Sequence, residues 1–259
     1  MSSAFLRQRV RALWRLTRAL AQVAGGLYIV TLRFPRLDAA ARMRGVQRWS
    51  QRVLRALDIE LVVAGVPAHA GALLAANHVS WLDIVAIDAV VPARFVSKAE
   101  VRDWPLLGRL VSAGGTLYLT RERSRDAHRI VHVMAAALAA GDTLAVFPEG
   151  TTGDGRALLP FHANLLQAAV SAGVPVQPVA LRFSDAGHAL SPAVEFVGDT
   201  SLLQSLWRVV SADRLCVCVT LLAPELAAGR TRREWAQALH QRLAGALAAP
   251  RYEGGTTCV

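Results

Sequence analysis

The spacing of hydrophobic and polar positions changes near residue 58 and divides the chain into two regions. Residues 1–57 carry apolar side chains at helical intervals, interrupted near Phe34 and Pro35, which predicts two N-terminal helices. From residue 58 to 259, short apolar runs alternate with amphipathic segments. This alternation predicts an α/β domain at 58–259, with a mainly parallel sheet flanked by helices, preceded by a two-helix element at 1–57.

The same pattern places the individual elements. Strands are expected at 60–64, 72–76, 94–97, 116–119, 143–147, 176–182, 193–197 and 214–222. Helices are expected at 81–90, 101–112, 124–140, 162–172, 201–211 and 232–248. The last helix has Thr231 and Glu234 at the spacing of a capping box. Because proline lacks an N–H, Pro175 and Pro178 are expected to restrict their strand to an edge or a bulge.

The net charge of +10 is an N-terminal feature. Twelve arginines and one acid, Asp38, precede Asp58, whereas 17 basic and 18 acidic residues follow from Asp58 onward. Apolar residues such as Leu13, Trp14 and Leu20 are interleaved with the arginines. This mixture suits a helix lying on an anionic membrane surface better than a nucleic-acid-binding arm. We therefore expect an anionic membrane as a partner, and no nucleic acid.

The uncharged run at residues 19–32 is short for a transmembrane helix, which needs about 20 apolar residues. It also contains Gln22 and the pair Gly25 and Gly26. The sequence has no compact apolar core followed by a small-residue cleavage site, so we expect no signal peptide. The prediction is a monotopic or peripheral protein at the cytoplasmic face of the inner (plasma) membrane, with residues 19–32 either crossing or only dipping into the bilayer.

Residues 77–83 read Asn-His-Val-Ser-Trp-Leu-Asp and follow the strand expected at 72–76. His78 would lie in the turn at the carboxyl end of that strand, where α/β proteins place ligands. Asp83, in the first turn of the next helix, could bond one ring nitrogen of His78 and leave the other free as a base. Ser80 and Asp83 are also spaced as a helix-capping pair, so this segment alone leaves a purely structural role open.

Two further segments offer groups for an anion or a polar head group. Residues 115–121 form an apolar strand that ends in Arg121, a fixed cation or an ordinary surface arginine. Residues 144–147 form a strand that opens into the glycine-rich loop 149–155, whose N–H groups and hydroxyls could face a ligand. Glu149 would repel a phosphate, so we expect it to hold a hydroxyl, the loop backbone or Arg121.

In order and spacing, four segments resemble the glycerolipid acyltransferase family, that of the bacterial lysophosphatidate acyltransferases. The matching blocks are Asn-His-x-Ser-x-x-Asp at 77–83, Gly-x-(apolar)-(aromatic)-(apolar)-x-Arg at 115–121, Phe-Pro-Glu-Gly-Thr at 147–151 and Val-Pro-(apolar)-x-Pro at 174–178. The resemblance implies an enzyme that its N-terminal helices seat on a membrane. It would move a fatty acyl group from a thioester of acyl carrier protein or coenzyme A to the hydroxyl of a lysolipid.

The resemblance also implies roles for individual residues. His78 would be the general base, and Asp83 would orient it. No metal or bound organic cofactor is required. The residues implied to bind the acceptor are Lys98, Arg121, Glu149, Gly150, Thr151 and Thr152.

The expected acceptor is 1-acyl-sn-glycerol-3-phosphate, which would give phosphatidic acid. Many members of the family carry arginine and then serine after the threonine of the third block, whereas this chain has Thr152 and Gly153. His162 likewise replaces a basic residue. Two positively charged side chains that could bind a phosphomonoester are therefore missing. For this reason another lysolipid, such as lyso-ornithine lipid, is the alternative acceptor. A catalytically silent membrane-binding module is the alternative of a different class.

Overall fold

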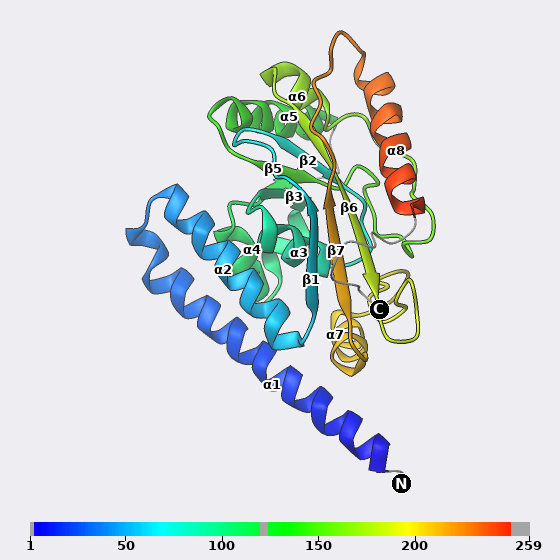
Figure 1. Cartoon of the computed structure of the whole chain (residues 1–259). Helices are drawn as coiled ribbons and strands as arrows, with labels where there is room; N and C mark the ends of the chain where they lie inside the picture. The colour runs from blue at the N-terminus through cyan, green and yellow to red at the C-terminus, as the bar shows by residue number, and fades with distance from the viewer. Residues whose placement is uncertain (1–2, 120–123, 250–259) are drawn as a thin grey trace.

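The computed structural model describes residues 3–119 and 124–249 and shows one central sheet with helices on both faces (Figure 1). The sheet has seven strands in the order β1-β7-β6-β2-β5-β3-β4. All neighbouring strands are parallel except β6 and β7, so the predicted mainly parallel α/β fold is confirmed. The strands are β1 (Glu60–Gly65), β2 (Leu73–Ala76), β3 (Arg94–Lys98), β4 (Leu117–Leu119), β5 (Leu144–Val146), β6 (Val176–Ser184) and β7 (Cys216–Leu221).

Two helices precede the sheet, as the sequence predicts: α1 (Ser3–Leu32) and α2 (Ala39–Leu57). They lie side by side along one flank of the molecule (Figure 1). A short 3₁₀ turn, η1 (Phe34–Arg36), separates them, and the Asp38 side chain accepts the N–H of Ala41 to cap α2. The other helices are α3 (Leu82–Val90), η2 (Ala99–Asp103), α4 (Leu107–Ala113), α5 (Ser124–Ala139), α6 (Gln167–Ala172), α7 (Leu202–Ser211) and α8 (Arg232–Ala248).

Strand β2 shows how the two faces of the sheet are covered. Leu74 and Ala76 pack into a cluster with α2, α3 and α7, and Leu73 and Ala75 pack into another with α5, α6 and α8. All four positions are buried, which is why a central parallel strand reads as a continuous apolar run. Leu54 of α2 joins the first cluster, so the N-terminal helices share a core with the sheet. The division of domains at residues 57 and 58 stays a prediction.

Of the two positions predicted for the proline-containing strand, an edge or a bulge, the edge is wrong, because β6 lies between β2 and β7. The pairing beside the prolines is bulged: Val179 pairs with Leu221 but Val176 pairs with Glu225, so the β7 side has one extra residue. The nitrogen of Pro178 is directed to the β7 side, where its own carbonyl accepts the N–H of Leu222 at 3.0 Å. The missing proline N–H leaves the Leu222 carbonyl without its ladder donor. The Gln177 side chain supplies one instead, with Nε2 at 2.9 Å from that carbonyl. A buried glutamine therefore lets a proline occupy an interior strand.

Three other elements differ from the prediction. Residues 193–197 form no strand, since Phe196 donates its N–H to the turn at Val79 instead of to a sheet neighbour. The helix expected at 101–112 is divided into η2 and α4, because Pro105 holds the preceding residue extended.

The helix expected at 162–172 begins only at Gln167. Its N-terminal part is not helical because the N–H of His162 is bonded to the carbonyl of Pro148 at 2.8 Å.

The capping box at Thr231 and Glu234 is present at the start of α8, as predicted. Within residues 3–119 and 124–249, no helix has both the length and the apolarity that a membrane crossing requires.

Candidate active site

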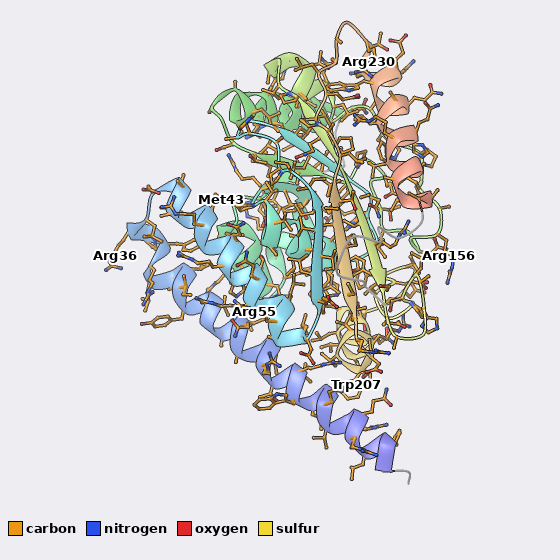
Figure 2. All side chains as sticks on the ribbon, in the orientation of Figure 1. Arg36, Met43, Arg55, Arg156, Trp207 and Arg230 are labelled. Atoms are coloured by element: carbon orange, nitrogen blue, oxygen red, sulfur yellow. The ribbon has the colours of Figure 1, made fainter. Side chains whose placement is uncertain are left out.

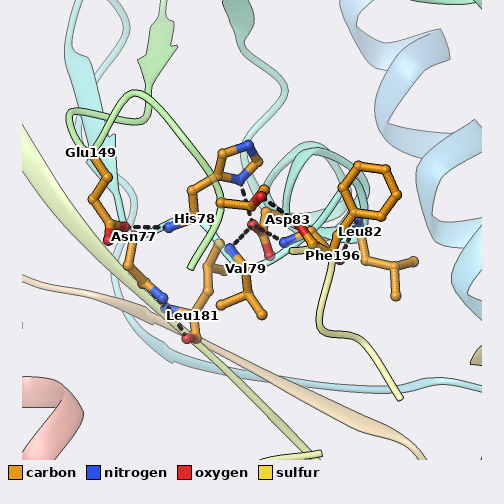
Figure 3. Close-up of polar contacts among 10 residues, drawn as sticks. Asn77, His78, Val79, Leu82, Asp83, Glu149, Leu181 and Phe196 are labelled. Carbon is orange, nitrogen blue, oxygen red and sulfur yellow. Dashed lines mark hydrogen bonds and ion pairs between the residues drawn. The ribbon is translucent and has the colours of Figure 1, made fainter. Parts of the chain in front are cut away.

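The site is built on the turn between β2 and α3. Asn77, the first residue after β2, is buried, and its side chain bridges to the neighbouring strand β6 (Figure 3). Its Nδ2 donates to the Leu181 carbonyl at 3.0 Å, and its Oδ1 accepts the Leu181 N–H at 2.7 Å. This amide pairing fixes the direction in which the chain leaves the sheet, and so the place of His78.

Asp83 binds both the His78 ring and the backbone of the turn, all through one oxygen. Oδ2 lies 2.7 Å from Nδ1 of His78 and accepts the N–H groups of Val79 at 2.6 Å and Ser80 at 2.9 Å. The Ser80 hydroxyl in turn accepts the N–H of Leu82, the first residue of α3. The helix-capping role and the histidine-orienting role that the sequence left open are therefore both filled by the same side chain.

These contacts determine the tautomer of His78. Since Oδ2 of Asp83 also accepts two backbone N–H groups, it acts as an acceptor, and Nδ1 of His78 is the donor to it. The lone pair is then on Nε2. The ring stacks on Phe147 with centroids 3.8 Å apart and planes within 8° of parallel, and 19% of the His78 side chain stays exposed. The ring is therefore held in one orientation, with one nitrogen available.

Glu149 joins the glycine-rich loop to the histidine turn. The residue is buried, its Oε1 accepts the N–H of His78 at 2.7 Å, and its Oε2 accepts the N–H of Leu159 at 2.8 Å. Burial raises the pKa of the Glu149 carboxyl, and the bonds from Leu159 and His78 oppose that rise. Of the roles expected from the sequence, the structure shows the one in which Glu149 holds the loop backbone.

The rest of the glycine-rich loop wraps around the histidine. Gly150 and Gly155 both have positive φ, at 70° and 75°, which lets the chain turn sharply twice. Gly153 donates its N–H to the His78 carbonyl at 2.8 Å, and the Thr152 hydroxyl donates to the Phe196 carbonyl. The Thr152 hydroxyl therefore has a partner within the protein, whereas Thr151 is exposed.

Of the two predicted cations, the structure describes only Lys98. Lys98 is exposed at the end of β3, on the same edge of the sheet as the His78 turn, because β3, β5 and β2 run parallel. It does not line the pocket at His78. Arg121 lies outside the described residues.

A pocket opens beside His78, with a volume of about 490 Å³. This is within the range of small-molecule sites, roughly 300–1,000 Å³. One wall is aliphatic, and the arginines at the pocket have partners: Arg156 pairs with Asp154 and Glu195, and Arg182 donates to the carbonyl of Ala249. The lining comprises Asn77, His78, Val79, Glu149, Gly153, Gly155, Arg156, Ala157, Leu158, Arg182, Ala189, Leu190, Ala244, Leu247 and Ala248.

For two residues of the site, Phe147 and Phe196, the sequence did not predict the contacts that the structure shows. Phe147 is part of the third block, but only the fold brings its ring against His78. Phe196 contacts Val79 and Thr152 from a segment that reads as a strand. Among the described residues, no group of three or more His, Cys, Asp or Glu side chains is placed to hold a metal ion.

Comparison with known proteins agrees with this geometry. The sequence model of the Acyltransferase family matches residues 61–182, which contain the whole His78 turn and the glycine-rich loop. The chain is 41% identical to the lyso-ornithine lipid O-acyltransferase of Pseudomonas aeruginosa, over 92% of this chain and 94% of that protein. It is also 41% identical to the 1-acyl-sn-glycerol-3-phosphate acyltransferase of Neisseria meningitidis serogroup B, over 69% of this chain and 71% of that protein.

A solved structure shares the fold. The crystal structure of the 1-acyl-sn-glycerophosphate (LPA) acyltransferase PlsC from Thermotoga maritima aligns with a TM-score of 0.69 and 21% identity, over 93% of this chain and 95% of that chain. This second likeness concerns the architecture, whereas the Pseudomonas relative matches in sequence along nearly the full length of both chains. The protein therefore belongs to the acyltransferase family and is an acyltransferase.

Proposed function

We propose that this acyltransferase moves a fatty acyl group from an acyl thioester to the free hydroxyl of a lysolipid, with His78 as general base and Asp83 as the group that orients it. The observation that carries the proposal is the 2.7 Å contact between Nδ1 of His78 and Oδ2 of Asp83. It leaves Nε2 as the basic nitrogen beside the pocket. Proton transfer by a positioned side chain of this kind contributes about 10²–10⁴-fold to a rate.

The acyl transfer needs no reactant other than the lysolipid and the acyl thioester. The hydroxyl proton of the lysolipid passes to Nε2 of His78 while the hydroxyl oxygen attacks the thioester carbonyl carbon. The tetrahedral intermediate collapses, the carbon–sulfur bond breaks, and the departing thiolate takes the proton from the imidazolium. Asp83 stabilises the positive charge that His78 carries between the two transfers. The donor is a thioester of acyl carrier protein or of coenzyme A.

The lining of the pocket supports a substrate that is partly apolar. Leu158, Leu190, Ala244 and Leu247 form an aliphatic wall in the lining. An acyl chain is the part of either substrate that gains from such a wall, since burying each CH₂ group is worth about 0.8 kcal/mol. The pocket therefore fits a fatty acyl group beside the histidine that acts on it.

The first candidate acceptor is 1-acyl-sn-glycerol-3-phosphate, after the activity named for the Neisseria relative. Lyso-ornithine lipid is the second, and one observation favours it. The Thr152 hydroxyl, at the position where many relatives carry an arginine, is bonded to the Phe196 carbonyl and adds no positive charge for a phosphate. The Pseudomonas relative, which matches over 92% of this chain, is named for lyso-ornithine lipid.

Membrane association is part of the same proposal. The outer side of α1 exposes large apolar side chains, including Leu6, Val10, Leu13 and Leu20, between the arginines. Such a helix is suited to lie in the interface of an anionic membrane. The protein would then be a monotopic or peripheral enzyme at the cytoplasmic face of the inner membrane, where acyl thioesters and lysolipids meet.

The test is an acyl-transfer assay with a panel of acceptors. A radiolabelled acyl thioester is offered with 1-acyl-sn-glycerol-3-phosphate, with lyso-ornithine lipid and with a monoacylglycerol that lacks a charged head group. The proposal predicts a labelled diacyl product from at least one charged lysolipid. In Thr152→Arg, use of the phosphate acceptor should rise relative to lyso-ornithine lipid. Failure of the wild-type protein to label any lysolipid would refute the proposal.

A further inference from the structure

A second hollow lies at the seam between α1 and α2 and has a volume of about 260 Å³. Figure 2 labels Arg55 at this seam and Arg156, of the pocket beside His78, on the other side of the molecule. The two sites are therefore separate. The hollow is lined by Arg18, Ala21 and Gln22 of α1 and by Arg52, Arg55 and Ala56 of α2.

Two of the three arginines are held in place by backbone carbonyls. Arg18 donates through Nη2 to the carbonyl of Arg55, and Arg55 donates through Nε to the carbonyl of Gln51 at 3.2 Å. A guanidinium has five N–H donors, so each of these bonds orients the group and leaves most of its donors for a ligand. The side chain of Arg52 makes no hydrogen bond or ion pair within the described residues.

The hollow holds positive charge without a matching acid. In the part of the chain that the structure describes, no carboxylate is within ion-pair distance of Arg18, Arg52 or Arg55. The nearest acid along the chain, Asp58, is paired with Arg15 at 3.0 Å. Three like charges around one hollow repel one another, and an anion bound among them removes that cost. Guanidinium groups match the oxygens of a phosphate in bidentate fashion.

The surroundings of the hollow indicate which phosphate it binds. Trp14 lies one helical turn before Arg18 and two turns before Ala21, and Tyr28 lies two turns after Ala21. Trp14 is 62% exposed and Tyr28 is 59% exposed. These two side chains, the exposed aromatic strip, lie on the same face of α1 as Ala21, which lines the hollow. Tryptophan and tyrosine are enriched where a protein meets the head-group level of a membrane.

We propose that the hollow between α1 and α2 binds the phosphate of an anionic phospholipid, whose acyl chains lie against the exposed aromatic strip. The site would give the enzyme a specific head-group contact in addition to the general attraction of a basic helix. The inference rests on Arg18, Arg52 and Arg55 and does not depend on which reaction His78 catalyses.

The test separates a specific phosphate contact from general charge attraction. Arg52→Lys keeps the charge but loses the planar fork, and Arg48→Lys is the matched control, one turn earlier on α2 and outside the hollow. Binding is measured by flotation with vesicles of phosphatidylcholine alone and with phosphatidylglycerol added. Arg52→Lys should bind the anionic vesicles about fivefold more weakly, because the lysine keeps the charge but loses one of the two parallel hydrogen bonds that a guanidinium makes to a phosphate. Arg48→Lys should bind as the wild type does.

Two results would overturn the proposal. Equal binding by the two lysine variants would mean that only diffuse attraction acts at this surface. Coenzyme A is the soluble phosphate source to exclude, so its affinity is measured for the wild type and for Arg52→Lys. A loss of coenzyme A affinity with unchanged vesicle binding would assign the hollow to the donor instead. Since vesicle binding is read without acyl transfer, this outcome is independent of the proposed reaction.

Discussion

Oδ2 of Asp83 lies 2.7 Å from Nδ1 of His78, and the same oxygen accepts the backbone N–H groups of Val79 and Ser80. The other oxygen, Oδ1, is buried and has no hydrogen-bond partner among the described residues. The carboxylate is therefore used through one atom, which both shapes the turn and orients the ring. These two uses can be separated by changing the other oxygen.

Asp83→Asn should impair catalysis far more than folding. The amide oxygen can take the place of Oδ2 and keep the backbone bonds, while the NH₂ group occupies the position of the unpartnered Oδ1. The negative charge that stabilises the His78 imidazolium is lost. We expect kcat/KM to fall by about 10²–10⁴-fold. The unpartnered amide should cost about 1–3 kcal/mol of stability.

Steady-state kinetics and a urea unfolding curve measure these two effects on the same preparation. A loss of activity below tenfold would show that the charge of Asp83 matters little to the reaction.

Glu149→Gln should loosen the histidine turn. The carboxylate accepts the N–H of His78 with one oxygen and the N–H of Leu159 with the other, so the amide can satisfy only one and presents donors to the second. A buried N–H without a partner costs about 1–3 kcal/mol. Displacement of His78 should lower kcat by roughly ten- to a hundredfold. Thermal unfolding and kcat are the readouts, and a variant with both values unchanged would contradict the bridging role.

The buried carboxyl of Asp88 should make the free energy of unfolding depend on pH. Burial raises the pKa of its carboxyl from 3.8 to about 8, and the bond from the Ala93 N–H opposes that rise. The unfolded chain releases this proton near pH 4, whereas the folded protein keeps it until about pH 8. The folded state therefore binds more protons in that window, and the free energy of unfolding falls as the pH rises through it.

Asp88→Asn keeps an acceptor for the Ala93 N–H and removes the titration. Its free energy of unfolding, from urea curves at several pH values, should exceed that of the wild type most at pH 8 and match it near pH 4. Burial also raises the pKa of Glu149, but this group titrates in both proteins and cancels in the difference. Asp199→Asn, which removes an exposed carboxylate, is the control. A constant difference across the pH range would refute the prediction for Asp88.

Patterns local to the chain predicted most of the fold. The apolar run of β2 and the capping residues of α3 place His78 and Asp83 correctly, because strand burial and helix capping depend on neighbours within a few residues. The break at Pro35 and the capping box at Thr231 follow from the same short-range chemistry.

Long-range contacts account for what the sequence did not predict. The interior position of Pro178 depends on the side chain of Gln177 reaching Leu222 on another strand. Residues 193–197 have a strand-like composition, yet Phe196 bonds to Val79 and Thr152. The role of Glu149 stayed open because its partner Leu159 is reached only once the loop has folded.

The central claim is that His78 is the base for acyl transfer, and the direct measurement compares wild-type protein with His78→Ala. Both are given a radiolabelled acyl thioester and the preferred lysolipid, after circular dichroism and vesicle flotation have shown that the variant folds and binds membranes as the wild type does. The account predicts labelled product from the wild type and a loss of about 10²–10⁴-fold in His78→Ala. Equal transfer by the two proteins would contradict it.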